Sequence, residues 1–72
     1  PTPMGSGLRD VHVLIVDPDS LLAQVLKDSL MKMGFRSIDI ARTSQGALHL
    51  LAQRDYDFVI SELPLPDGSG LH

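Results

Sequence analysis

The 72-residue sequence contains no cysteine and no tryptophan, and its aromatic residues are one tyrosine and two phenylalanines. The lack of cysteine excludes disulfide bridges, a thiolate nucleophile and zinc sites of the cysteine type. The longest uninterrupted apolar run covers residues 13–16, whereas a membrane-spanning helix needs about 20. The first residues also lack the charged start and apolar stretch of a secretion signal. We therefore expect a cytoplasmic chain that makes no membrane contact.

Positive charge is scarce, with six Lys and Arg against nine Asp and Glu and a formal net charge of -3. Binding to a nucleic-acid backbone requires clustered basic side chains, and these are scattered along the chain, so we expect no direct contact with nucleic acid. Eight of the nine acidic residues are aspartate, and Glu62 is the single glutamate. The basic residues are Arg9, Lys27, Lys32, Arg36, Arg42 and Arg54.

The length permits one small core, because a chain of this size buries only about 60% of the surface that its unfolded form exposes. Residues 1–7 show no apolar periodicity, and Met4 to Gly7 resembles a remnant of an expression vector. We expect residues 1–10 to form a disordered leader or such a remnant, and residues 11–72 to form the folded domain.

The first half of the domain reads as a strand followed by a helix. Residues 11–16 are nearly all β-branched or leucine, which is typical of a central strand in a parallel sheet. The next four residues, from Asp17 to Ser20, combine a turn with helix-capping side chains. Gly34 is expected to end the helix. The predicted buried stripe consists of Leu22, Val25, Leu26, Leu30 and Met33.

The second half repeats this order. Residues 37–40 alternate between polar and apolar, which predicts a short edge strand. Thr43 or Ser44 is expected to cap a second helix that runs to about Arg54. Residues 58–61 predict a third strand, and residues 62–70 a loop. The expected buried face of the second helix is Ala47, Leu48, Leu51 and Ala52.

Alternating strands and helices predict an α/β fold with a parallel β-α-β-α-β order and right-handed crossovers. Ligands of such sheets bind beyond the carboxyl ends of the strands. Asp17 and Asp19 follow the first strand, and Glu62 follows the third. With a strand order of 2-1-3, these strands are neighbours, and the three carboxylates form an acidic pocket.

These motifs resemble the first half of a response regulator receiver domain of two-component signalling. The resemblance rests on the apolar strand that ends in Asp17 and on residues 57–68, DFVISELPLPDG. It implies a CheY-like, flavodoxin-like half-domain, of which the chain supplies about two and a half of five βα units. We therefore expect a truncated domain that belongs to a larger regulator.

In that family, acids after the first strand bind Mg²⁺, and an aspartate after the third strand accepts a phosphoryl group from a histidine kinase. By position, Asp17 matches the first acid, Pro18 the second, and Glu62 the phosphoacceptor. The resemblance therefore implies a pseudo-receiver that is not an enzyme and is not phosphorylated. Binding of Mg²⁺ through Asp17 is expected to be weakened or lost. The expected partner is a sensor histidine kinase or another signalling protein.

Other interpretations of the same residues stay open. Asp17 and Asp19 are also typical helix-capping residues, and Glu62 is also compatible with an ordinary loop carboxylate. The Asp-Pro-Asp segment resembles the first motif of haloacid dehalogenase-type phosphatases, with Asp17 as nucleophile and Asp19 as general acid or base. A purely structural interaction module is a third alternative. Because the third strand would lie at an open sheet edge, we also expect the isolated chain to self-associate.

Overall fold

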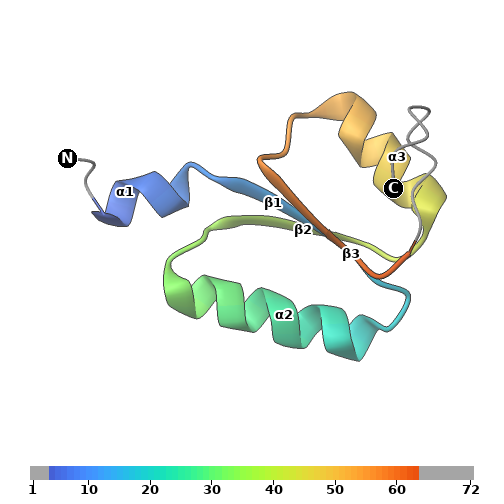
Figure 1. Cartoon of the computed structure of the whole chain (residues 1–72), viewed down its shortest axis with the longest axis horizontal. Coiled ribbons are helices and arrows are strands. Elements are labelled where there is room, and N and C mark those ends of the chain that lie inside the picture. Colours follow the sequence, from blue (N-terminus) through green and yellow to red (C-terminus); the bar gives the residue numbers. More distant parts are fainter. Residues whose placement is uncertain (1–3, 64–72) are drawn as a thin grey trace.

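The computed structural model describes residues 4–63, so most of the loop predicted over residues 62–70 lies outside the described part. Three parallel strands form one sheet in the order β2-β1-β3. Helix α2 covers one face of this sheet and α3 covers the other, which gives three layers (Figure 1). The elements are α1 (Met4–Arg9), β1 (His12–Val16), α2 (Ser20–Met33), β2 (Ser37–Ala41), α3 (Ser44–Gln53) and β3 (Phe58–Ser61).

The observed architecture confirms the predicted α/β half-domain and the strand order 2-1-3. In a parallel sheet each connection must run back from the carboxyl end of one strand to the amino end of the next. Here the two connections contain α2 and α3, which lie on opposite faces of the sheet. The strand predicted over residues 11–16 begins one residue later, at His12, and the third strand has its predicted bounds. Within residues 4–63, no helix is both long enough and apolar enough to cross a membrane.

The core lies on both faces of β1, whose residues from Val13 to Val16 are almost fully buried. Alternate side chains of a strand point to opposite faces, so this apolar run supplies both layers. The cluster on the α2 face contains Val13, Ile15, Ala23 and Ile38. The cluster on the α3 face contains Leu14, Val16, Ala41 and Ala47.

Both long helices begin at capping side chains that the sequence marked, and α2 ends at the predicted glycine. Asp19 caps α2, and Thr43 caps α3 by accepting a hydrogen bond from the Gly46 amide at 2.9 Å. Gly34 closes α2 with φ +116°, a left-handed conformation that glycine adopts with little strain. Its amide donates to the carbonyl oxygens of Leu30 and Met31. The predicted helix boundaries are confirmed to within a few residues.

Residues 4–9 differ from the sequence expectation, because they form helix α1 where no regular structure was predicted. Its end lies against the last turn of α2: a Cβ at position 34 would approach Leu8 Cδ1 to 3.2 Å. The Val11 amide also donates to the Leu8 carbonyl at 3.3 Å. Such a tertiary contact leaves no trace in local periodicity. The division of the domain at residue 11 stays a prediction.

The helix stripes are only partly buried. On α2, Leu26 and Leu30 pack against the core as expected, but Ala23 is the fully buried residue. On α3, Ala47 and Leu51 pack inward, with Leu50 in place of the predicted Leu48 and Ala52. The exposed members of the predicted α2 stripe are Leu22, Val25 and Met33. These side chains extend beyond the width of a sheet that has one strand on each side of β1.

Candidate functional site

The candidate site begins with Asp17, which follows the last residue of the central strand β1. Its amide donates to the Ala41 carbonyl at 2.9 Å, which continues the ladder to β2. The residue is only 3% exposed. Its Oδ1 atom accepts a hydrogen bond from the Asp19 amide at 2.9 Å, whereas the buried Oδ2 atom has no hydrogen-bond partner. A buried carboxylate oxygen normally has a donor or a cation beside it.

Asp19 uses its carboxylate in a different way. Its Oδ1 atom accepts hydrogen bonds from the Leu21 amide at 3.0 Å and the Leu22 amide at 3.2 Å. These amides have no partner within the helix, so the exposed side chain acts as the N-cap of α2. Pro18, between the two aspartates, contributes no polar side-chain atom to the edge. The capping interpretation of Asp19 is confirmed, and its membership of an acidic pocket stays a prediction.

Glu62 follows β3 directly and lies at the same edge of the sheet. Its amide donates to the Val16 carbonyl at 2.9 Å. The Ser61 hydroxyl accepts from the Leu63 amide at 3.1 Å and donates to the Leu63 carbonyl at 2.5 Å. Because Val16 pairs with Ser61 in the ladder, Asp17 and Glu62 occupy adjacent positions just beyond it. The structure thus brings these two residues to one edge, and the Glu62 side chain is exposed there.

The donor set at this edge decides which cation it suits. Mg²⁺ prefers oxygen ligands, keeps several waters and is often held by only one or two carboxylates. The unpartnered Oδ2 atom of Asp17 fits that role, and Glu62, which follows the neighbouring strand β3, is the second available carboxylate. In residues 4–63, however, no three acidic, His or Cys side chains are grouped so that they could hold a metal ion. A cation at this edge would therefore have fewer than three such protein ligands among the described residues.

The sequence did not predict a polar cluster that joins Asp39 on β2 to Arg54 and Tyr56. The Tyr56 hydroxyl donates to Asp39 Oδ2 at 2.6 Å, and Arg54 reaches the same oxygen at 3.1 Å. Burial, the hydrogen bond to Asp39 and the charge of that carboxylate raise the pKa of Tyr56 to about 12, with Arg54 opposing. The polar face of the alternating segment was the available signal, but it did not identify the partners.

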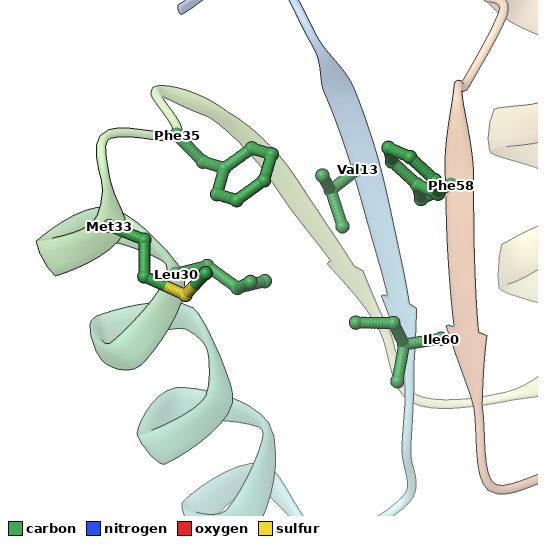
Figure 2. A pocket seen from close by; sticks show the side chains of 6 residues that line it. All are labelled: Val13, Leu30, Met33, Phe35, Phe58 and Ile60. Atoms are coloured by element: carbon green, nitrogen blue, oxygen red, sulfur yellow. The ribbon is translucent and has the colours of Figure 1, made fainter. Parts of the chain in front are cut away.

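The sheet also forms an apolar groove of about 230 Å³ between α2 and β3. Figure 2 shows Leu30 and Met33 on the helix facing Phe58 and Ile60 on the strand. All four residues of β3 are exposed, although the strand is mostly apolar. Val13 and Phe35 complete the lining. The groove lies on the α2 face, and no polar side chain lines it.

The parallel three-layer arrangement and the carboxylates beyond β1 and β3 define a receiver-type module. Residues 13–72 match the family model of the response regulator receiver domain, and the chain belongs to this family of two-component signalling modules. Receiver domains are generally signalling modules rather than enzymes. The match supports the receiver interpretation of Asp17 over the phosphatase alternative.

Three curated relatives show the breadth of this family. The chain is 36% identical over 64 residues to the aerobic respiration control sensor protein ArcB of Escherichia coli K12, covering 89% of the chain and 8% of that protein. It is 30% identical over 63 residues to the chemotaxis protein CheY-3 of Vibrio cholerae, covering 88% of the chain and 48% of that protein.

The third relative is the transcriptional regulatory protein MalR of Bacillus subtilis. It is 32% identical over 62 residues, which cover 85% of the chain and 26% of MalR. The chain therefore spans less than half the length of each of these relatives. No solved structure gives a significant match.

Proposed function

We propose that the chain acts as a pseudo-receiver: it takes part in two-component signalling through protein contacts and does not accept a phosphoryl group. The observation that carries this proposal is Glu62 at the end of β3, next to the buried Asp17. In the family that the chain belongs to, this position carries the phosphoaccepting aspartate. The chain would then be a non-enzymatic part of a larger cytoplasmic regulator.

Two substitutions relative to the family pattern support the loss of phosphorylation. The extra methylene of glutamate moves the carboxylate by roughly 1.5 Å, and in-line transfer tolerates displacements of about that size poorly. Pro18 removes the second acid, and Asp19 cannot replace it while its carboxylate caps α2. Less negative charge remains to hold the cation that would neutralise a transferring phosphoryl group.

The charge of Glu62 also suggests how the module signals without phosphorylation. An exposed carboxylate on a longer side chain partly imitates a phosphorylated aspartate, although with one negative charge instead of nearly two. Its partner would be a sensor histidine kinase or another signalling protein that recognises this state. The curated relatives, which include a sensor protein and a transcriptional regulatory protein, are consistent with such a setting.

The test restores the family pattern with Pro18→Asp and Glu62→Asp together. We expect the double variant to bind Mg²⁺ at least about tenfold more tightly than the wild type in calorimetry, because it gains a carboxylate at the site. Incubation with acetyl phosphate and Mg²⁺ should add a phosphoryl group to the variant and none to the wild type, as read by mass spectrometry. Gln53→Asp is the matched control. It adds the same single negative charge as the double variant, but at the last residue of α3 and not at the site. Phosphorylation of wild-type Glu62 would refute the proposal.

The edge of the sheet at β3 supports the proposed self-association. Its apolar side chains are exposed on both faces, and its outer backbone groups have no strand partner among the described residues. Such edges pair readily with another strand. Light scattering across a range of concentrations should show a mass that rises above that of the monomer, and Val59→Lys should lower it. A monomeric wild type at high concentration would refute this part.

A further inference from the structure

The carboxyl edge of the sheet carries one positively charged side chain that the receiver pattern does not explain. Arg42 follows β2 directly, as Asp17 follows β1 and Glu62 follows β3. Its side chain is exposed, and within residues 4–63 it makes no hydrogen bond or ion pair. An unpaired guanidinium and an unpartnered buried carboxylate oxygen therefore lie at the same edge of one small sheet.

The ladder places Arg42 and Asp17 side by side. Val16 pairs with Ala41 in the parallel register, so the next positions on the two strands are Asp17 and Arg42. The Asp17 amide donates to the Ala41 carbonyl at 2.9 Å, which shows that the strands are still paired at this point. Neighbouring strands are about 4.8 Å apart, which an arginine side chain can span. Pairing requires the exposed Arg42 side chain to rotate and the atoms that cover the buried Asp17 Oδ2 to shift.

The charges of the site favour this pairing. Asp17 and Glu62 lie at this edge, and Asp19 caps α2 two residues after Asp17. Arg42 is the basic residue in the sequence that directly follows a strand at this edge. A guanidinium donates to carboxylates through a planar fork and stays charged at all relevant pH values. It can satisfy the Asp17 Oδ2 atom without the further oxygen ligands that a metal ion requires.

We propose that Arg42 is the built-in counter-ion of this site: its guanidinium pairs with the Asp17 carboxylate in the metal-free protein and competes there with divalent cations. This inference deepens the proposed function. It rests on that function in one respect, because it takes Asp17 as the carboxylate of the site. It explains how a receiver site that lacks its second acid keeps a buried carboxylate compensated. The pseudo-receiver would then hold one state without any ion.

A double-mutant cycle without metal tests the pairing. Asp17→Asn keeps the Oδ1 acceptor for the Asp19 amide and removes the charge. We expect Arg42→Ala to lower the folding equilibrium constant about fivefold in the wild type and by less than about twofold in the Asp17→Asn background. Equal effects of Arg42→Ala in both backgrounds overturn the proposal.

Competition with Mg²⁺ gives a second measurement that stands even where Asp17→Asn fails to fold. Arg42→Ala removes a positive charge beside the cation site. The variant should therefore bind Mg²⁺ about tenfold more tightly than the wild type does. Arg36→Ala is the matched control, because it removes the same charge at the opposite edge of the sheet, before β2. An Arg42→Ala variant that binds Mg²⁺ no more tightly than Arg36→Ala overturns the proposal.

The two proposals fail separately. Phosphoryl transfer to the wild-type chain would refute the pseudo-receiver function and leave the metal-free coupling of Asp17 with Arg42 unaffected. Additive effects in the cycle would refute the counter-ion and leave the absence of phosphorylation standing.

Discussion

Tyr56→Phe is expected to remove a pH-dependent contribution to the stability of this domain. The substitution deletes the hydroxyl that donates to Asp39 Oδ2 at 2.6 Å and leaves the ring in its place against the α3-face core. The hydrogen bond joins the segment before β3 to the edge strand β2. Its loss should therefore loosen the connection from α3 into β3.

The magnitude follows from the pKa of Tyr56, which rises from 10.0 to about 12 on folding. Each pKa unit corresponds to about 1.36 kcal/mol, so the upper limit is about 2.7 kcal/mol. The cluster is partly exposed, with the Arg54 and Asp39 side chains 54% and 35% accessible. Solvent screening reduces the expected loss to about 1 kcal/mol, which lowers the Tm of a domain of this size by about 4–8 °C.

The sign of the pH dependence is defined by the raised pKa. The protonated phenol is favoured in the folded state, so its contribution is complete below pH about 10 and disappears between about 10 and 12. Urea unfolding can be followed by circular dichroism from pH about 7 to about 11. The free energies of unfolding of the wild type and Tyr56→Phe should converge toward the alkaline end of this range. Asp39→Ala is the control background, in which Tyr56→Phe should cost less and the convergence should be weaker, because burial still raises the pKa of Tyr56 there. Parallel stability profiles across the whole range would refute the reasoning.

Three further substitutions test the local structure. Asp19→Ala removes two capping hydrogen bonds from α2 and should cost about 1 kcal/mol in the free energy of unfolding, measured by urea titration. Gly34→Ala imposes a side chain at φ +116° close to Leu8 and should lower the free energy of unfolding by at least about 1 kcal/mol. Ser37→Ala is the control, because Ser37 lies nearby at the start of β2 and does not end a helix. Ile15→Ala should lower the free energy of unfolding by about 2–5 kcal/mol, because Ile15 is fully buried. Ile60→Ala should lower it clearly less, because Ile60 is 36% exposed. Equal losses would contradict the two-layer core.

The elements of this fold are readable from short-range patterns. The continuous apolar run before Asp17 indicates a strand with both faces covered, and that strand is the centre of the sheet. Asp19, Gly34 and Thr43 mark helix ends because their side chains or backbone freedom solve a local hydrogen-bonding problem. The family resemblance of Asp17 and Glu62 rests on spacing along the chain and required no three-dimensional information.

The relations between distant residues required the folded chain. Nothing in the local sequence pairs Tyr56 with Asp39, places Leu8 over Gly34, or leaves Asp17 with one unpartnered oxygen. Each of these depends on which strands are neighbours and in which register they align. The alternating and continuous apolar patterns report which way a side chain faces, but not what it meets there. Arg42 became a candidate counter-ion only when the register of β1 with β2 set it beside Asp17.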